Sequence, residues 1–340
     1  MNIALDATYS IGNELSGVGV YSREILFGLA HAHPEAHFDF CYRPHRYFPS
    51  WREDLPRNVR RRLGFRSGDL FHGLNQRLPE ISLQRSVATF HDLFVLTGEY
   101  STPEFRERFA AQARDASARA DALITVSQFT KDQIVSLLGI PASRITVVHH
   151  GVRSRDRNKG ELIPREKIIL NVGALQKRKN ITRLVQAFEA VDPQWSLVLV
   201  GSSGYAVEDI LARIEKSAAR ARIQVTGYAS PATLASWYAR ASIFAFPSLD
   251  EGFGMPVLEA MASGVPVITS NRSALPEVAG NAAVLIDPED TDALATTLRE
   301  LCGNEDQRQE LARRGKIRAQ EFTWEKAVSK TWSVYRSLLD

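Results

Sequence analysis

The chain of 340 residues is 44% hydrophobic and 24% charged, with a formal net charge of +3. These values are ordinary for a globular protein, and the length allows two domains with sizeable cores. The two cysteines, Cys41 and Cys302, lie far apart, which excludes a disulfide framework or a cysteine metal motif and fits a reducing, cytoplasmic compartment. We expect neither a signal peptide nor a membrane span, because no long apolar run is visible.

Short apolar segments in the first half of the chain predict strands at 2–8, 38–42, 70–74, 87–90, 122–126 and 145–149. Helical patterns lie between several of them, up to residue 29 and at about 103–119 and 129–138. Strands that alternate with helices predict a parallel doubly wound sheet, in which ligands bind beyond the carboxyl ends of the strands. The polar residues expected at that edge are His91, Asp92, Ser127 and the segment 149–151.

A glycine-rich turn, Ser16-Gly17-Val18-Gly19, precedes the first predicted helix. A strand, a turn and a helix in this order are typical of an anion site at a helix N-terminus. The turn is not a dinucleotide fingerprint, because no third glycine completes G-x-G-x-x-G. Two interpretations of Gly17 and Gly19 therefore stay open, tight packing and the approach of a ligand to the backbone.

The positive charge is concentrated in the first half: residues 1–157 hold 20 basic and 17 acidic side chains, and residues 158–340 hold 22 of each. The excess gathers at Arg57, Arg60, Arg61, Arg62 and Arg66. We favour a solvated surface turn here. The alternative is a patch for anionic lipid or a phosphorylated acceptor, which would give peripheral contact with a membrane. Aromatic residues do not alternate with the arginines of this run, so we expect no nucleic-acid partner.

Residues 153–167 are polar and lack apolar periodicity, and we interpret them as an interdomain linker. Strands are predicted beyond them at 168–173, 197–201, 223–227, 243–246, 265–269 and 283–286. Helices are predicted from about 180, at about 206–220 and 232–241, and at 324–339. The expected organisation is an N-terminal domain at 1–157, a C-terminal domain at 158–322 and a terminal helix at 323–340.

The stretch FPSLDEGFGMPVLE combines features of a ligand site. Gly252 and Gly254 make a turn, and Pro256 suits the first turn of a helix. A helix N-terminus suits phosphate, and the carboxylates of Glu251 and Glu259 can accept hydrogen bonds from sugar diols. The stretch therefore has the outline of a nucleotide-sugar site. The alternative is an ordinary glycine loop before a helix stabilised by a glutamate in its first turn.

The longer frame PSLDEGFGMPVLEAMASGVPVITSN, together with Phe90-His91-Asp92-Leu93, resembles the retaining family-4 glycosyltransferases of GT-B fold. The resemblance implies an α/β protein with two Rossmann-like doubly wound domains facing across a cleft, and a last helix that crosses back to the N-terminal domain. It implies transfer of a hexose from a nucleotide-diphosphate sugar to a hydroxyl of a glycan or lipid-linked acceptor. We favour mannose from GDP-mannose; UDP-glucose and UDP-GlcNAc are alternatives.

The same resemblance assigns roles to individual residues. It implies catalytic roles for His91, Arg178, Lys179 and Glu251. It implies substrate binding by Gly17, Gly19, Asp92, Ser127, Tyr228, Gly252, Phe253, Gly254, Met255, Pro256, Val257 and Glu259. Many relatives carry the arginine directly after the strand glycine, where this chain has Ala174, so Arg178 is taken as its substitute. Many also carry Asn where His150 stands, which leaves the role of His150 open.

The sequence predicts no metal site, and no cofactor is implied. Without the resemblance, the cations at 177–179 would be interpreted as a solvated loop. Other classes stay open as alternatives: a GT-B nucleotide-sugar epimerase, or a non-catalytic module that binds sugar nucleotides. A nucleotide-dependent oxidoreductase is disfavoured because the dinucleotide fingerprint is absent.

Overall fold

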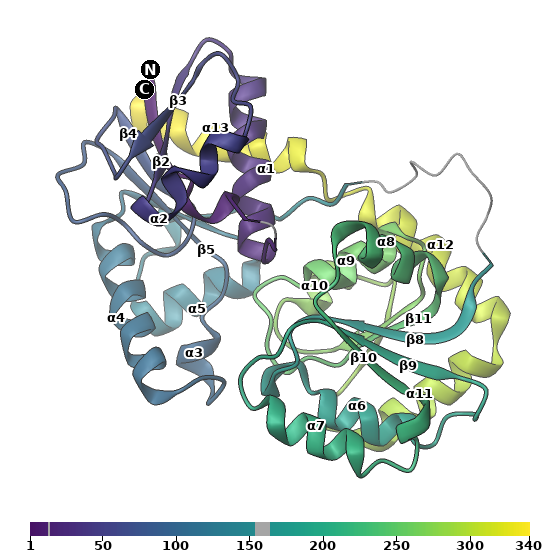
Figure 1. Cartoon of the computed structure of the whole chain (residues 1–340). Helices are drawn as coiled ribbons and strands as arrows, with labels where there is room; N and C mark the ends of the chain where they lie inside the picture. The colour runs from purple at the N-terminus through teal and green to yellow at the C-terminus, as the bar shows by residue number, and fades with distance from the viewer. Residues whose placement is uncertain (13, 154–163) are drawn as a thin grey trace. The chain divides into compact units, whose positions relative to one another are not determined.

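The computed structural model describes residues 1–12, 14–153 and 164–340, which belong to two compact units (Figure 1). Unit 1 comprises Met1–Gly151 and Thr323–Asp340, and unit 2 comprises Val152–Phe322. The expected boundary at 157/158 lies outside the described residues, as does most of the expected linker. Among the described residues, no helix is both long and apolar enough to cross a membrane.

Unit 1 is built on a parallel sheet with the strand order β3-β2-β1-β4-β5-β6-β7. Its strands are β1 (Asn2–Asp6), β2 (His37–Tyr42), β3 (Val59–Leu63), β4 (Leu70–Gly73), β5 (Ser86–Phe90), β6 (Ala122–Thr125) and β7 (Ile145–Val147). Its helices are α1 (Gly17–Ala32), α2 (Pro44–Tyr47), α3 (Phe94–Thr97), α4 (Pro103–Arg119), α5 (Gln128–Leu138) and α13 (Trp324–Leu339). The order reverses between β1 and β4, which is the switch point where such sheets bind ligands.

Helices cover both faces of the unit 1 sheet, as the alternation of side chains along β5 shows. Ala88 and Phe90 point to one face and pack in a core cluster with Phe109 and Ala113 of α4. Thr89 points to the other face, where its hydroxyl lies 3.0 Å from that of Tyr21 on α1. A parallel sheet that is buried on both faces explains why its central strands read as continuous apolar segments.

The terminal helix α13 belongs to unit 1, although it follows the whole of unit 2 in the sequence. It packs against α1, and the hydroxyl of Tyr335 lies 2.5 Å from Nδ1 of His72 on β4. The other nitrogen of the same ring lies 2.8 Å from Oγ1 of Thr89, so a buried polar network joins α13 to β4 and β5. The expected crossing of the last helix back to the N-terminal domain is thus confirmed.

Unit 2 repeats the same design with the strand order β10-β9-β8-β11-β12-β13, again all parallel. Its strands are β8 (Glu166–Val172), β9 (Ser196–Val200), β10 (Ile223–Gly227), β11 (Ala241–Phe246), β12 (Val267–Ser270) and β13 (Val284–Ile286). Its helices are α6 (Ile181–Phe188), α7 (Val207–Glu215), α8 (Pro231–Arg240), α9 (Met255–Ala262), α10 (Leu275–Ala279), α11 (Thr291–Gly303) and α12 (Glu305–Ala319). Figure 1 shows helices on both faces of this sheet, and its switch point lies between β8 and β11.

Two predictions about local structure are wrong. The arginine run at 57–66 is not a surface turn, because Arg60, Arg61 and Arg62 lie in β3, a strand at the edge of the unit 1 sheet. The end of the expected linker is part of unit 2, because β8 begins at Glu166, and Arg165 donates hydrogen bonds to the carbonyls of Ser263 and Gly264 at 2.8 Å. The arginine run is polar because β3 is an edge strand, where charged side chains reach water. Glu166 and Lys167 are polar because they are the exposed first residues of β8, whose later residues are buried.

Candidate active site

A buried cluster of three charges lies at the switch point of unit 2. Arg178 and Lys179 belong to the 3-10 turn that follows β8, and Glu251 belongs to the loop that follows β11. One carboxylate oxygen of Glu251 forms an ion pair with Lys179, and the other lies 2.9 Å from Nη1 of Arg178. The hydroxyl of Ser248 donates to the same carboxylate at 2.6 Å. The structure thus brings three of the predicted catalytic residues into direct contact.

The two loops that carry these charges are joined through their backbones. The carbonyl of Arg178 accepts a hydrogen bond from the amide of Leu249 at 2.8 Å and lies 3.0 Å from the hydroxyl oxygen of Ser248. The guanidinium of Arg178 donates to the carbonyl of Asp250 at 2.7 Å. The cluster is therefore held by the fold of both loops as well as by its own charges.

Two residues with a left-handed backbone flank the cluster, Asn180 at φ 59° and Ser273 at φ 56°. Asn180 donates its side-chain amide to the carbonyls of Pro247 at 3.0 Å and Pro288 at 2.6 Å. Ser273 accepts a hydrogen bond from the amide of Glu251 at 3.1 Å. Such strained conformations persist where the surrounding structure holds them, and they gather at functional sites. Sequence analysis named neither residue as part of the site; only Asn180, which tolerates this conformation, gave a signal.

The charge of Glu251 is stabilised by its neighbours. Burial would raise the pKa of this carboxyl, but the charges of Arg178 and Lys179 and the hydrogen bonds outweigh burial and hold the pKa at about 2. The carboxylate is therefore ionised throughout the neutral range. Two cations and one anion leave the cluster with a net positive charge, which suits an anionic ligand such as a diphosphate.

The glycine loop leads into α9 as the sequence predicts. Gly254 has φ 101°, and a Cβ atom there would lie 2.6 Å from Cδ2 of Leu275, so only glycine fits. No side chain caps α9, which begins at Met255 and has Pro256 in its first turn, whereas Gly252 lies buried in the loop. The side chains of Phe253 and Val257 are buried in the core of unit 2, so of these two residues only backbone groups can meet a ligand.

Glu259 and Tyr228 lie at the same edge of the unit 2 sheet. Glu259, in the second turn of α9, accepts a hydrogen bond from the hydroxyl of Tyr238 at 3.0 Å. Tyr238 is fully buried and also reaches the carbonyl of Pro256 at 3.3 Å, so it fixes the glutamate against its own helix. Tyr228 follows the carboxyl end of β10 and is exposed. The sequence gives no sign of Tyr238, because it lies on another helix, α8, and only the folding of unit 2 brings it near Glu259.

His91 is buried at the carboxyl end of β5 in a cluster of rings. Its Nε2 lies 2.9 Å from the carbonyl of Leu74, which follows β4, so this nitrogen carries the hydrogen. Its ring centre is 4.7 Å from that of Tyr21, edge to face, and 5.6 Å from that of His150, stacked. Burial lowers the pKa of His91 to about 4, so the ring is neutral near pH 7 and its Nδ1 can accept a hydrogen bond.

Two of the remaining predicted residues of unit 1, Ser127 and Gly19, have structural roles. Ser127 is fully buried and caps α5, because its hydroxyl accepts the amide of Thr130 at 3.0 Å. A Cβ on Gly19 would lie 2.9 Å from the carbonyl of Tyr9, so tight packing explains this glycine. Gly17 is exposed at the start of α1, and Asp92 is half-buried beside His91.

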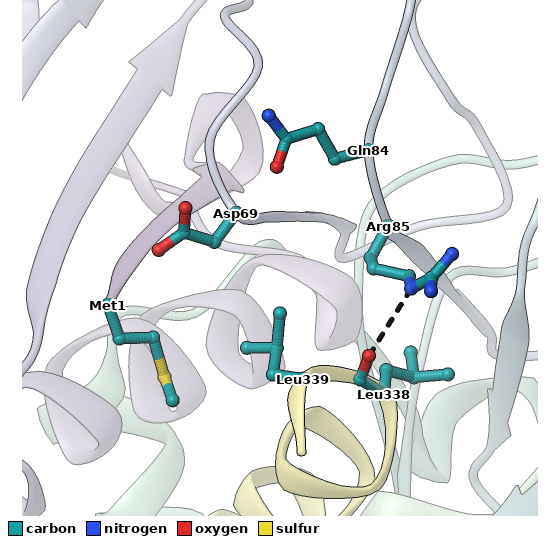
Figure 2. Close-up of a pocket in the computed structure, with 6 residues that line it drawn as sticks. All are labelled: Met1, Asp69, Gln84, Arg85, Leu338 and Leu339. Atoms are coloured by element: carbon teal, nitrogen blue, oxygen red, sulfur yellow. Dashed lines mark hydrogen bonds between the residues drawn. The ribbon is translucent and has the colours of Figure 1, made fainter.

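A separate hollow of about 710 Å³ lies at the other edge of the unit 1 sheet (Figure 2). Asp69 and Arg85 line it where β4 and β5 begin, beside Met1 and Leu338 near the two chain ends. None of the predicted site residues lines it. Among the described residues, no three histidine, cysteine or acidic side chains gather as metal ligands.

Comparisons with known proteins identify the family of this chain. A family model described as "Glycosyl transferases group 1" matches residues 152–318, and one described as "Glycosyltransferase Family 4" matches residues 20–155. O-antigen chain mannosyltransferase B of Escherichia coli is 32% identical over 284 residues, which are 79% of this chain and 74% of that protein. Serotype-specific mannosyltransferase WbdA of the same species is 26% identical over 260 residues, 71% of this chain but 32% of that longer protein.

Solved structures show the same fold. Sucrose-phosphate synthase from Thermosynechococcus elongatus superposes with a TM-score of 0.79 over 99% of both chains, at 22% identity. Together with the two parallel sheets, this likeness confirms the expected GT-B architecture.

Proposed function

Because the chain belongs to the family-4 glycosyltransferases, we propose that it is a retaining hexosyltransferase that takes mannose from GDP-mannose. The observation that carries this proposal is the net-positive cluster of Arg178, Lys179 and Glu251 at the switch point of unit 2. It combines cations for a diphosphate with a carboxylate for sugar hydroxyls. The donor assignment is supported by the mannosyltransferase that is 32% identical to this chain over 284 residues.

A thermal-shift panel of GDP-mannose, UDP-glucose, UDP-GlcNAc and ADP-glucose tests the donor. A ligand that binds only the folded state raises the apparent stability by mass action, by about 2.7 kcal/mol at one hundred times its Kd. We expect the largest shift with GDP-mannose. A larger shift with UDP-glucose or UDP-GlcNAc would move the assignment to those alternatives without touching the transferase class.

Different groups of unit 2 would bind different parts of the donor. Arg178 and Lys179 would bind the diphosphate and stabilise charge on the leaving phosphate, as preorganised cations do in low dielectric. The backbone of the glycine loop and the start of α9 would add amide donors. Glu259 would accept from the ribose diol, Tyr228 would lie near the base, and Glu251 would accept from hydroxyls of the transferred sugar.

His91 would act on the transferred sugar while it carries positive charge. Its neutral ring, fixed by the Leu74 carbonyl, would place Nδ1 as an acceptor for a sugar hydroxyl. In the proposed front-face reaction the bond from the anomeric carbon to the leaving phosphate breaks. The acceptor oxygen attacks from the same side, and its proton passes to that phosphate. Asp92, next in the chain, would orient His91 or meet the acceptor.

We propose that the reaction needs no divalent metal, because Arg178 and Lys179 would supply the positive charge that a metal gives elsewhere. The proposal also requires no other cofactor. Transfer measured with and without EDTA tests it, with unchanged rates expected. A complete loss of activity that magnesium or manganese restores would contradict it.

Simple assays distinguish a transferase from two alternatives, an epimerase and a non-catalytic binding module. An epimerase would convert the nucleotide sugar without an acceptor, so analysis of the products formed from donor alone would reveal it. A non-catalytic module would bind the donor but never release free GDP when acceptor is added. We expect GDP release that depends on the acceptor.

We further propose a cytoplasmic enzyme whose acceptor is a glycan or a lipid-linked glycan. The relation to an O-antigen chain mannosyltransferase supports this class of acceptor. A lipid-linked acceptor would bring the enzyme to the inner face of a membrane, with the arginine run at 57–66 as the proposed contact.

A further inference from the structure

The segment 43–66 has a higher density of positive charge than the chain as a whole. It holds eight arginines against two acidic residues, a net charge of +6 in a chain whose total is +3. The rest of the protein is therefore net negative. Not all of these arginines are available: Arg62 pairs with Asp39 at 2.9 Å, and Arg61 donates to the carbonyls of Ser50 and Glu53. Arg52 and Arg66 are exposed.

The two most exposed large apolar side chains of the described residues lie in the same segment, Phe48 at 76% and Trp51 at 62%. Both follow α2, which packs against β2 and β3 at the edge of the unit 1 sheet. Tyr47 ties them together, with ring centres 5.6 Å from Phe48 and 6.3 Å from Trp51. Leu63, at the end of β3, is a further exposed apolar residue.

Arg61, Trp51 and Leu63 lie on one side of β3, and two exposed arginines are close to them in the sequence. The guanidinium of Arg61 lies 5.2 Å over the ring of Trp51, and Leu63 points to the same side of β3 because it is two residues further along the strand. Arg52 follows Trp51 directly, and Arg66 follows Leu63 by three residues. We call Phe48, Trp51, Leu63, Arg52 and Arg66 the aromatic–arginine face.

We propose that the aromatic–arginine face docks unit 1 on the surface of an anionic lipid bilayer. Aromatic side chains prefer the headgroup level of a membrane, and arginines are attracted by its negative potential. Charge complementarity disfavours a second copy of the chain, because a symmetric dimer would bring two such positive faces together. Single-stranded nucleic acid is disfavoured because the arginine over Trp51 covers one side of the only indole on this face.

This proposal deepens the proposed function by naming the surface on which a lipid-linked acceptor would be met, and its test is independent of that function. Vesicle binding needs no donor or acceptor, whereas transfer to a water-soluble acceptor needs no vesicle. If transfer fails but vesicle binding holds, the enzyme assignment is wrong and the docking face stands. If vesicle binding fails but transfer to a water-soluble acceptor holds, the docking face is wrong and the enzyme assignment stands.

The test is co-sedimentation of the full chain with vesicles of phosphatidylcholine, with and without phosphatidylglycerol. We expect at least about tenfold stronger binding to the anionic vesicles, weakened by added salt. The double variant Phe48→Ser/Trp51→Ser and the double variant Arg52→Ser/Arg66→Ser should each lose most of this binding. The matched control, Leu211→Ser/Ile317→Ser, removes exposed apolar side chains from unit 2 and should bind as the wild type does.

Melting temperature and the donor thermal shift confirm that each variant is folded, since all the changed side chains are exposed. Equal binding of the wild type to both kinds of vesicle would overturn the proposal, as would an equal loss in the control variant. So would a single-stranded RNA or heparin that binds as tightly as the anionic vesicles and ignores the Phe48→Ser/Trp51→Ser change, because that result describes a general polyanion surface.

Discussion

Units 1 and 2 present the same kind of parallel sheet but place opposite chemistry at its carboxyl edge. Unit 2 buries three charges there, Arg178, Lys179 and Glu251, and each finds a partner of opposite sign. Unit 1 buries rings: His91 stacks with His150, lies edge to face with Tyr21, and is held neutral by burial. The net-positive edge of unit 2 suits an anionic phosphate, and we propose that the neutral edge of unit 1 meets the transferred sugar.

The difference follows from how each edge is held. Charges can be buried in unit 2 because two loops supply hydrogen bonds and counter-charges to one another, which offsets the cost of desolvation. No ion pair to His91 is found among the described residues, so the same burial drives the proton off this ring. The comparison therefore predicts that changes in unit 2 alter nucleotide binding as well as the chemical step, whereas changes in unit 1 alter the chemical step and leave nucleotide binding unchanged.

The largest effect is expected from Lys179→Met, which removes one buried cation and leaves the rest of the cluster in place. We expect kcat/KM to fall roughly 10³- to 10⁵-fold, the range for a cation that stabilises a transferring phosphate. Lys177→Met is the matched control, because Lys177 belongs to the same 3-10 turn but is exposed. Steady-state kinetics check both variants, and similar losses in the two would place the phosphate elsewhere.

His91→Ala should lower kcat by roughly 10²- to 10⁴-fold, because an interaction that strengthens in the transition state acts on kcat. The Kd of GDP, which unit 2 is proposed to hold, should stay unchanged. Titration calorimetry and kinetics measure the two quantities on the same protein. Near-normal kcat in the folded fraction would show that His91 only packs the end of β5.

His33→Ala is the control for lost packing, because His33 stacks on Trp332 at 3.7 Å within the same unit. We expect it to lower the melting temperature and leave kcat unchanged. His91→Gln sharpens the test, since a glutamine amide can still donate to the Leu74 carbonyl but offers no imidazole nitrogen. If His91→Gln retains full activity, the carbonyl contact, and not the ring, is what matters.

Much of the fold could be predicted from local patterns. The bounds of α4 and α13 and the start of α9 near Pro256 were all predictable from apolar periodicity and proline chemistry. The edge strand β3 was not, because three of its five residues are arginine and its pairing partner lies elsewhere in the chain. An edge strand needs only one buried face, so its sequence carries little of the apolar signal.

The site was predictable as a set of residue types and not as a geometry. Glu251, Arg178 and Lys179 stand out by charge beside a glycine loop, but their mutual pairing depends on β8 and β11 being neighbours in the sheet. Ser273 could not be found, since nothing in the sequence marks a serine with a left-handed backbone. The sequence predicts ligand binding by Ser127, but a serine at this position also caps a helix, as it does here.

Glu259→Ala should weaken nucleotide binding by about 1.5–3 kcal/mol, the range for a hydrogen bond to a charged group. The change in kcat at saturating donor should be small, because the proposed contact is to the ribose. Tyr238→Phe is the control: it removes the hydroxyl bound to Glu259 but leaves the carboxylate. Calorimetry with GDP decides, and an unchanged Kd in Glu259→Ala would remove this residue from the site.

The two edges should also respond differently to acid. In folded unit 1 the pKa of His91 is lowered to about 4 and that of His72 to about 3 by burial, against about 6.5 when unfolded. Each ring therefore stabilises the fold above pH about 6.5, and that contribution is lost as the pH falls, by about 1.4 kcal/mol per pH unit and ring. Glu251, with a pKa of about 2, loses its contribution only below pH about 4.5.

Hydrogen exchange followed separately in each unit measures this difference between pH about 7.5 and 5. We expect protection in unit 1 to fall first while unit 2 is little changed. His91→Gln should reduce the pH slope of unit 1 by about one proton. Equal loss of protection in the two units would mean that the buried histidines do not control the acid response.

The smallest expected effect has the most informative sign. The carboxylate of Glu251 forms ion pairs with both cations, Arg178 and Lys179, that are proposed to bind the diphosphate. Glu251→Gln removes that competing charge, so free GDP should bind roughly 3- to 10-fold more tightly although kcat falls, because cations without a counter-charge attract phosphate more strongly. Glu189→Gln is the control, since Glu189 also pairs with an arginine and a serine, at 2.9 and 2.7 Å. Weaker binding of GDP to Glu251→Gln would instead mean that the carboxylate's main role is to hold Arg178 and Lys179 in place.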